Sequence, residues 1–405
     1  MRDVERIVRE QGRIYGEYPA FEPQHYTFLA HYLPHALGDG MEHRNSTVIS
    51  APASIRADRL QLLGTVAHEF FHAWNVERIR PRSLEPFDLD GGNMSGELWL
   101  AEGFTQYYGS LTLNRAGLVE LSSTLADFRD LIASVVLNDA RRVRTAEDMS
   151  RMAVFTDGAP TIDRTNWSTT FISYYQFGGA IALALDLSLR ERSGGQVTLD
   201  DYMRALWREH GRPGGTRAGH VDRPYTVSDA EARLAEVAGD PSFARDFFGR
   251  FIQGHEVADY ARLVRHAGLL LRRPRGSEAW IGDVNLTSGA RGVRLDDTPP
   301  RGTPLYAALA DRGDEIVELG GHRTSSVDRL SEVLRRLKPG QTVPIVIDDR
   351  ASSSRTGSAD HAVLTRRTTI VVAGNPMLDL VPAETTGATV TAAERAFRRA
   401  WLESR

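Results

Sequence analysis

The chain of 405 residues contains no cysteine. This absence excludes disulfide bonds, a thiol nucleophile and the cysteine-rich kind of structural zinc site. Any metal ion bound by this chain must therefore take its ligands from His, Asp and Glu. Long apolar runs are missing as well, because no uninterrupted stretch approaches the roughly 18–20 residues that a membrane span needs. We expect a soluble protein with no membrane span.

The chain also lacks an excess of charge of either sign. It has 49 Lys and Arg residues against 53 Asp and Glu residues, which gives a formal net charge of -4. This balance argues against nucleic acid and anionic lipid as partners. The first residues alternate charges and contain no apolar segment of the kind found in signal peptides. The sequence therefore predicts a cytoplasmic protein, long enough for two or three domains.

Hydrophobic periodicity divides the chain into segments of different character. These are residues 1–53, a β segment; 54–273, a mostly helical domain; 276–372, a small β-rich domain; and 373–405, a tail with a short helix. Within the first segment we expect strands near residues 26–29 and 47–49, with a turn at Gly38–Gly40. A Ser-rich stretch at 351–361 is typical of a hairpin tip. The predicted fold class is α+β.

Three residues of the helical domain, His68, Glu69 and His72, form the pattern H-E-x-x-H. Residues four apart on a helix lie on the same face, so both imidazoles can bind one zinc ion. Glu69 would then lie beside the metal-bound water, where a carboxylate can act as a general base. The alternative is that both histidines are ordinary surface or core residues of a helix.

A catalytic zinc site usually has three protein ligands and one open position. Glu102 is the candidate third ligand, because it lies in an apolar segment where burial of an unpaired carboxylate is costly. Two alternatives remain. Glu102 could pair with Arg78 or Arg80, or the ligand could be Glu97, although Glu97 precedes the apolar run and is typical of a helix start.

Together, the stretches His68–Pro81 and Leu98–Thr105 resemble the glycyl aminopeptidase family of zinc metallopeptidases. That family is related to aminopeptidase N and has a thermolysin-like catalytic domain followed by a PDZ domain. The resemblance covers nearly the whole chain. It implies that His68, His72 and Glu102 bind Zn2+ and that Glu69 is the general base. The segment between His72 and Glu102 is longer than in aminopeptidase N and suits the glycyl branch.

The stretch Gly38–Asn45 resembles the strand that runs along the substrate in the aminopeptidase N group. This implies that Gly40, Met41 and Glu42 contact the substrate and that Glu42 binds its free α-amino group. A carboxylate at the closed end of a cleft selects an N-terminal ammonium through a charge-assisted hydrogen bond. The alternative is that Glu42 is a solvated turn residue.

The stretch Ser173–Gly179 resembles the family segment whose tyrosine donates a hydrogen bond to the tetrahedral oxyanion. Tyr175 matches that donor, Tyr174 is the second candidate, and Phe177 replaces the lysine that is usual there. One such hydroxyl can contribute about 3 kcal/mol to catalysis. The alternative is that the two tyrosines begin a buried helix.

Residues 302–340 resemble a PDZ domain of the bacterial type, which binds extended peptides by adding a strand to a sheet edge. Trp280–Gly282 is the candidate loop that faces the peptide carboxylate. The alternative is that this domain only braces the catalytic one. Members of the family carry a β-domain before the substrate strand, and few residues precede Glu42 here. We therefore expect either a natural minimal form or a fragment, and in a fragment the missing signal peptide says little about localisation.

The sequence thus predicts a zinc-dependent aminopeptidase that removes N-terminal residues, glycine or alanine, from peptides with a free N-terminus. Two other functions stay open. One is a non-catalytic scaffold in which the PDZ domain binds peptides, and the other is a zinc endopeptidase, if Glu42 does not close the cleft. The histidines outside the H-E-x-x-H pattern show no paired ligand spacing and are expected to be surface or core residues.

Overall fold

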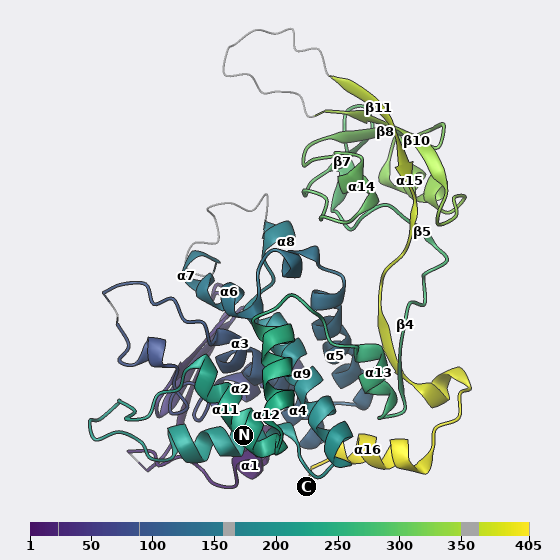
Figure 1. Ribbon diagram of the computed structural model, residues 1–405. Helices are drawn as coiled ribbons and strands as arrows, with labels where there is room; N and C mark the ends of the chain where they lie inside the picture. Colours follow the sequence, from purple (N-terminus) through teal and green to yellow (C-terminus); the bar gives the residue numbers. More distant parts are fainter. Residues whose placement is uncertain (23, 89, 157–166, 350–363, 405) are drawn as a thin grey trace.

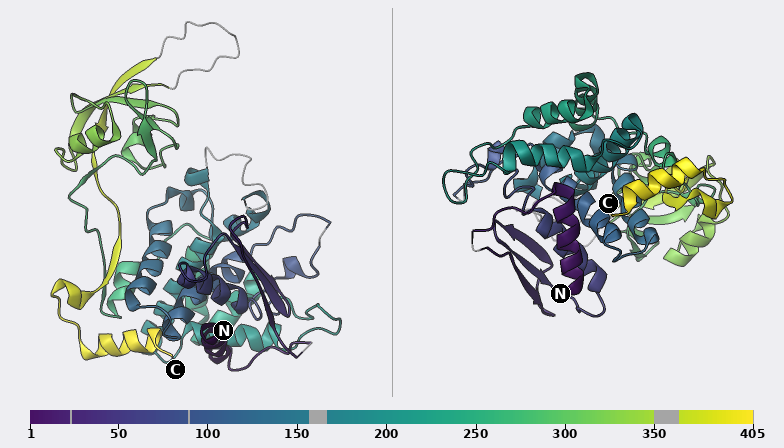
Figure 2. Two further views of the ribbon diagram at one scale, coloured as in Figure 1. Left: turned by 180° about the vertical axis from the view of Figure 1, so that it is seen from behind. Right: turned by 90° about the horizontal axis from the view of Figure 1, so that it is seen from below.

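Residues 1–22, 24–88, 90–156, 167–349 and 364–404 are described here in a computed structural model (Figure 1). Helices and strands both contribute to the fold, as expected. Most helices gather in one unit, and two extended stretches join it to a smaller β-rich unit (Figures 1 and 2). The expected hairpin tip at 351–361 lies outside the described residues. Within the described ranges, no helix combines the length and the apolar character that crossing a lipid bilayer requires.

A three-stranded sheet packs against the helical unit and is drawn in purple in Figure 1. It consists of β1 (Thr27–Tyr32), β2 (Asp39–His43) and β3 (Ser46–Ala51). The central strand β3 is parallel to β1 and antiparallel to β2. Strand β2 is therefore an edge strand, and both β2 and β3 contact helix α2 (Arg59–Phe71).

The position of the first turn differs from the sequence prediction. Asp39 and Gly40 begin strand β2, and the chain turns instead at Arg44 and Asn45. Pairing of β2 with β3 along its whole length outweighs the turn preference of the Gly-Asp-Gly run. The predicted substrate residues Gly40, Met41 and Glu42 consequently lie on an extended edge strand.

A helix also lies within the first segment, which had been predicted as β. Helix α1 (Arg2–Tyr15) buries Ile7, Ile14 and Tyr15 and ends at Gly16, which has the left-handed conformation. Its Gln11 side chain donates a hydrogen bond to the Ala67 carbonyl of α2 (2.6 Å). The dense alternating charges of α1 concealed this apolar stripe.

The predicted helical character of residues 54–273 is confirmed. After α2 come α3 (Leu98–Ala101), α4 (Gly103–Arg115) and the long α9 (Tyr174–Ser193). The other helices of this unit are α5 (Leu121–Val136), α6 (Ala146–Arg151), α7 (Ala153–Thr156), α8 (Trp167–Thr170), α10 (Leu199–Leu206), α11 (Val227–Ala238), α12 (Pro241–Phe247) and α13 (Tyr260–Arg265). Short 3-10 or π turns lie at Arg82–Leu84, Asp139–Arg142, Trp207–Gly211 and Phe248–Ile252.

Helices α4 and α9 cross at very close range through two glycines. A Cβ atom on Gly103 would come within 2.3 Å of the Gly178 Cα atom, so neither position has room for a side chain. This contact begins directly after Glu102, which links α3 to α4. The crossing therefore fixes the position from which the Glu102 side chain projects.

The smaller unit has its own apolar core, which includes Ile281, Leu305, Ile316, Ile345 and Val372. Its elements are β5 (Ala279–Trp280), β6 (Leu286–Ser288), β7 (Val293–Leu295), α14 (Pro304–Ala307), β8 (Glu315–Leu319), β9 (His322–Arg323), α15 (Val327–Leu334), β10 (Thr342–Asp348), β11 (Thr365–Val371) and β12 (Ala373–Gly374). The main sheet has the antiparallel order β11-β10-β8-β7-β6, and β9 pairs with β8. Strand β6 is one edge of this sheet.

The tail returns to the helical unit. Strand β13 (Asp379–Pro382) pairs with β4 (Leu269–Arg272) and is followed by a 3-10 turn (Ala383–Thr386) and helix α16 (Ala392–Leu402). Trp401 is fully buried, and its indole N–H donates to the Tyr107 hydroxyl of α4 (2.8 Å). The two chain ends therefore lie near each other, as Figures 1 and 2 show.

Candidate metal centre and substrate cleft

The three predicted metal ligands converge at the C-terminal end of α2. His68 lies in the last turn of α2, and His72 follows the helix directly with a helical conformation. The two Nε2 atoms are 3.1 Å apart. Glu102 Oε2, at the junction of α3 and α4, is 3.2 Å from each of them. The structure thus brings together His68, His72 and Glu102, whose ligand atoms form one compact group.

The spacing of these three atoms fits a tetrahedral metal ion. Ligands bound to zinc at 2.0–2.1 Å with tetrahedral angles lie about 3.3–3.4 Å from one another. The other ring nitrogen of His72, Nδ1, donates a hydrogen bond to the Asn75 carbonyl (2.7 Å), which leaves Nε2 with its lone pair directed at the group. Two imidazole nitrogens and a carboxylate oxygen therefore face one position that suits a cation.

Asn75 is a supporting residue that sequence reasoning missed. Its fully buried side chain donates hydrogen bonds to the carbonyls of Leu100 and Ala101, both at 3.0 Å. Asn75 therefore connects the segment after His72 to the end of α3, immediately before Glu102. The available signal was a polar residue in an otherwise apolar stretch close behind the H-E-x-x-H pattern.

The ionisable side chains of this group shift the pKa values of one another. Although burial acts in the opposite direction, Glu102 and Glu42 raise the pKa of His72 well above its usual value. Burial alone would raise the pKa of Glu102, but His72 and His68 outweigh it and hold this pKa well below its ordinary range. The carboxylate is therefore held ionised beside the imidazoles, which favours binding of a positive ion.

Glu69 lies beside these ligands and is only 5 % exposed. Its Oε2 atom is buried and has no hydrogen-bond partner in the described part of the chain. Burial raises the pKa of Glu69 to about 6, although His72 and His68 act to lower it. A carboxyl group with a pKa near neutrality can take up and release a proton readily, as a general base must.

The edge strand β2 presents Glu42 to the same end of α2. Carboxylate or ring atoms of Glu42, Glu69 and His72 all lie within 4.8 Å of one another. Met41 is 50 % exposed, on the alternate side of the strand. Among the predicted substrate residues, the structure therefore places Glu42 near the candidate metal ligands and Gly40 against Glu69, whereas Met41 is exposed to solvent.

Two further residues near Glu42 were not singled out by the sequence. The buried hydroxyl of Tyr26 has no hydrogen-bond partner among the described residues, and its pKa is raised by burial and then by the charges of Glu69, Glu77 and Glu42. Burial also raises the pKa of Glu77. Arg80 acts to lower this pKa, and Glu42 acts to raise it. This end of the site is consequently rich in carboxylates.

The two candidate tyrosines differ in their surroundings. Tyr174 is 4 % exposed and belongs to the main apolar core. The ring centre of Tyr175 is 5.8 Å from that of His68, and Tyr175 lines the same cleft as His68 and Glu69. The position of Tyr175 suits an oxyanion donor, whereas Tyr174 suits a core role.

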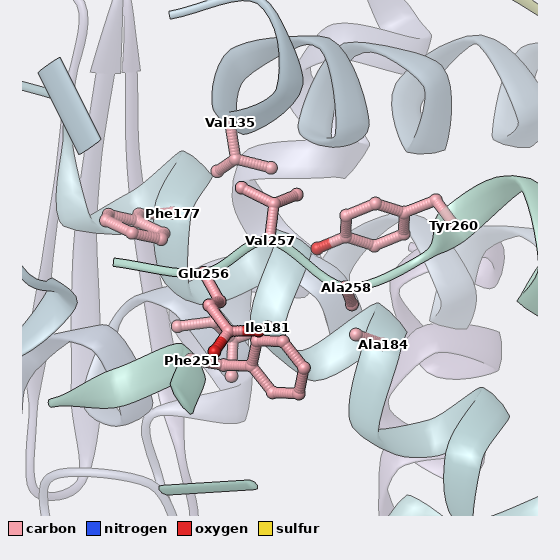
Figure 3. A pocket seen from close by; sticks show the side chains of 9 residues that line it. All are labelled: Val135, Phe177, Ile181, Ala184, Phe251, Glu256, Val257, Ala258 and Tyr260. Carbon is pink, nitrogen blue, oxygen red and sulfur yellow. The ribbon is translucent and has the colours of Figure 1, made fainter. Parts of the chain in front are cut away.

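A cleft of about 730 Å³ opens from this group between α2, α4, α5 and the start of α9. His68, Glu69, Gly40 and Tyr175 line one part of it. A second hollow, between α9 and the chain near Val257, is shown in Figure 3. Its volume of about 10 Å³ holds no more than about one water molecule. The cleft beside His68 is therefore the candidate substrate site.

The alternative partners of Glu102 are engaged elsewhere. Arg80 pairs with Glu85 (2.7 Å) and Glu77 (3.4 Å), and Arg78 donates to the backbone carbonyls of Arg44, Ala73 and Ala20. Glu97 precedes α3 and accepts hydrogen bonds from the hydroxyls of Ser83 and Ser95. These contacts favour Glu102 over Glu97 as the third ligand.

The candidate carboxylate-facing loop of the smaller unit contains acidic groups of its own. Trp280 belongs to β5, and its indole N–H donates to Asp283 Oδ1 (2.8 Å). The backbone N–H of Asn285 is bonded to the Asp297 carboxylate (3.1 Å). Two internal carboxylates thus accept hydrogen bonds close to the loop Trp280–Gly282, whose role toward a peptide end stays a prediction.

One protein-family model and a solved structure are similar to this chain. Residues 61–181 match the family model described as M61 glycyl aminopeptidase. No curated protein sequence matches the chain. An aminopeptidase N family protein from Idiomarina loihiensis has a similar solved structure, with a TM-score of 0.73 and 21 % identity. The similarity covers 99 % of this chain but only 65 % of that protein, so the chain spans about two thirds of its length.

A weaker likeness involves an HtrA-type protease, AlgW, solved with a decapeptide. It has 14 % identity and a TM-score of 0.20, and it covers 40 % of each chain. A TM-score this low does not establish a common fold. Of these two similarities, the one to the Idiomarina protein reaches the level of the fold.

Proposed function

We propose, from the match of residues 61–181 to the M61 glycyl aminopeptidase family model, that this chain is a zinc-dependent aminopeptidase of that family, which releases N-terminal residues, glycine or alanine, from peptides. The observation that carries the proposal is the grouping of His68, His72 and Glu102 at 3.1–3.2 Å with Glu42 close by. The preference for small residues follows from the family description.

His68, His72 and Glu102 would hold the zinc ion. When bound, zinc lowers the pKa of a water molecule and polarises a carbonyl group. Glu69, next to His68 and lining the cleft, takes the proton of the attacking water and passes it to the amine that leaves. Its pKa of about 6 suits both transfers near neutral pH.

Tyr175 and Glu42 act on the substrate from different sides. The Tyr175 hydroxyl donates a hydrogen bond to the oxygen that becomes negative when the carbonyl is attacked, an interaction that forms fully only in the transition state. The Glu42 carboxylate accepts hydrogen bonds from the α-ammonium group and so fixes the first peptide bond beside Glu69. An internal peptide segment has no ammonium group to offer Glu42.

The edge strand β2 can also hold the substrate backbone. One side of β2 pairs with β3, and the other side is the sheet edge, where an extended peptide can add as a further strand. Gly40 and Glu42 lie on the same face of β2, toward α2. A peptide on this edge would therefore pass Glu69 and end at Glu42.

For the smaller unit, we propose a PDZ domain that binds an extended peptide at the edge strand β6. The edge position of β6 and its contact with α15 support this assignment, because such peptides lie between a strand and a helix. Fluorescence anisotropy of labelled peptides with the full chain tests it. Replacing Ser288 of β6, whose N–H group faces away from β7, by proline removes a donor from the edge and should abolish binding, whereas equal binding by the variant would contradict the assignment.

The test of the main proposal combines metal analysis with hydrolysis of glycyl and alanyl p-nitroanilides and their N-acetylated forms. We expect one zinc per chain, cleavage of the free-amine substrates only, and loss of activity in Glu69→Gln with zinc retained. Equal cleavage of acetylated substrates would favour an endopeptidase. Stoichiometric zinc without turnover of any peptide would favour a non-catalytic peptide-binding scaffold and would overturn the proposal.

A further inference from the structure

The cleft extends well beyond the residues assigned to catalysis. Past His68 and Tyr175, it is lined by the first half of α2, by α4 and by α5. Uncharged polar side chains make up much of this wall: Gln61, Thr65, Gln106, Ser110, Ser123 and Gln176. A volume of about 730 Å³ is sufficient for several peptide residues.

Two elements give the cleft a direction relative to a bound substrate. On β2, Glu42 lies toward one end, and Asp39 and Gly40 at the other end line the cleft. On α2, His72 contacts the Glu42 end, whereas Thr65 and Gln61 line the cleft one and two turns, respectively, before His68. A substrate with its ammonium group at Glu42 would therefore place the residues after the cleaved bond in the cleft.

The charged residues of this wall are almost all acidic. Asp39, Asp127 and Asp130 line the cleft with Glu69, and no arginine or lysine lines it among the described residues. Asp130 is ion-paired, because the Arg129 guanidinium donates two hydrogen bonds to its Oδ1 atom at 2.8 and 2.9 Å. Asp127, one helical turn before Leu131, has no ion pair among the described residues and interacts with Ser110. Partial burial and the charge of Asp130 raise the pKa of Asp127, although Ser110 and the charge of Arg129 act to lower it.

An independent observation marks this cleft as a place for a ligand. Glu69, which lines it, is more than nine-tenths buried and keeps Oε2 without a partner in the described residues. The acidic wall is therefore continuous with a buried polar group directed at the reaction site. A cationic side chain placed along this wall would find the Asp127 carboxylate, which forms no ion pair among the described residues.

We propose that the cleft binds the residues on the C-terminal side of the cleaved bond and that Asp127 selects peptides with a Lys or Arg side chain there. This inference rests on the proposed aminopeptidase function and adds the class of its substrates. The acidic wall would also repel Asp and Glu side chains at the same positions.

The test uses C-terminally amidated tetrapeptides and the zinc-loaded full chain. The peptides are Ala-X-Ala-Ala and Ala-Ala-X-Ala with X as Lys, Gln or Glu, and the released alanine is measured. At one of the two positions we expect kcat/KM to be about fivefold higher for Lys than for Gln, the upper range for a partly exposed ion pair, and lower for Glu than for Gln. The Lys preference should shrink at 0.5 M salt.

Asp127→Asn should bring the Lys-to-Gln ratio close to one, and the ratio is independent of any general effect on turnover. Asp246→Asn is the matched control, because it removes from α12 one carboxylate of an exposed pair with Arg250 (3.2 Å) and should leave the ratio as in the native chain. A Lys preference that persists in Asp127→Asn would overturn the role of Asp127.

The outcomes separate this inference from the function on which it rests. Equal kcat/KM for the Lys, Gln and Glu peptides at both positions, with alanine released, would overturn the inference and leave the aminopeptidase in place. Absence of alanine release from every peptide, with zinc bound, would overturn both.

Discussion

Gly40 of strand β2 lies directly against the carboxylate of Glu69. A Cβ atom at position 40 would come within 2.1 Å of Glu69 Oε1, which is shorter than any real contact of this kind. The glycine therefore lets an edge strand approach the candidate general base closely. This contact explains why a glycine occupies the second position of β2, although the sequence alone assigns Gly40 to a turn.

Replacing Gly40 by alanine should displace the Glu69 carboxylate and reduce kcat by about 100-fold or more, the range attributed to a positioned general base. Zinc content should stay at the native level, because Glu69 is not among the proposed ligands. Gly38→Ala is the matched control, since nothing lies within 4 Å of a Cβ atom there and its backbone conformation is ordinary. Similar kinetics of the two variants would contradict the role of this contact.

Substituting phenylalanine for Tyr175 should lower kcat about 100-fold and leave KM for alanyl p-nitroanilide almost unchanged, because the hydroxyl acts on the transition state. Tyr174→Phe is the comparison, since that ring lies in the core and a small stability change is expected instead. Steady-state kinetics of both variants decide between the two tyrosines. A larger loss of kcat in Tyr174→Phe would identify Tyr174 as the oxyanion donor instead of Tyr175.

Asn75→Ala should weaken zinc binding about 10- to 100-fold, the usual effect of losing a residue that orients metal ligands. The physical reason is that the variant loses the hydrogen bonds to Leu100 and Ala101, which hold Glu102 toward the histidines. Competition with a coloured chelator measures the affinity. Asn93→Ala is the control, as among the described residues its side chain bonds the Asp88 carbonyl of a surface loop (2.9 Å). Unchanged affinity in Asn75→Ala would show that this connection is not needed.

Stability at low pH should depend on the buried pair of Asp200 and Arg115 (2.9 Å). Burial alone would raise the pKa of Asp200, but Arg115, Arg190 and the Tyr108 hydroxyl outweigh it and lower the pKa. A carboxyl group with a lowered folded-state pKa stabilises the fold above its unfolded pKa of about 3.9, and this contribution disappears as the pH falls through the folded-state value.

Asp200→Asn should therefore reduce the free energy of unfolding at pH 7 by about 3–5 kcal/mol, because Arg115 stays buried without a counter-charge. The difference in the free energy of unfolding between the variant and the native chain should decrease between pH 5 and pH 3. Urea unfolding followed by circular dichroism at several pH values measures it, and Asp246→Asn serves as the exposed control with a change below about 1 kcal/mol. If this difference in the free energy of unfolding stayed constant with pH, the result would contradict the stabilising role of ionised Asp200.

Sequence patterns predicted the features that depend on short-range periodicity. The spacing of His68 and His72 on one helix face, the helical domain, the β-rich unit and the helix after Thr391 all appear in the structure. Glu102 joins the histidines because an acidic residue in an apolar helical segment needs a positive partner.

Features that depend on tertiary contact were beyond the sequence. Strand pairing with β3 decided that Gly40 is extended, and packing on α2 made α1 a helix despite its charges. Neither the hydrogen bonds of Asn75 nor the acidic wall around Asp127 has a local signature, because each joins segments far apart in the chain. The different surroundings of Tyr174 and Tyr175 likewise follow from which face of α9 meets the core.

The central claim is that one zinc ion at His68, His72 and Glu102 makes this chain an aminopeptidase. Its most direct test is a titration of the metal-free protein with zinc while hydrolysis of alanyl p-nitroanilide is followed. We expect the rate to rise linearly and to level off at one zinc per chain, with no activity gained in Glu102→Ala at the same zinc concentrations. A rate that does not depend on zinc, or equal activation of Glu102→Ala, would contradict the claim.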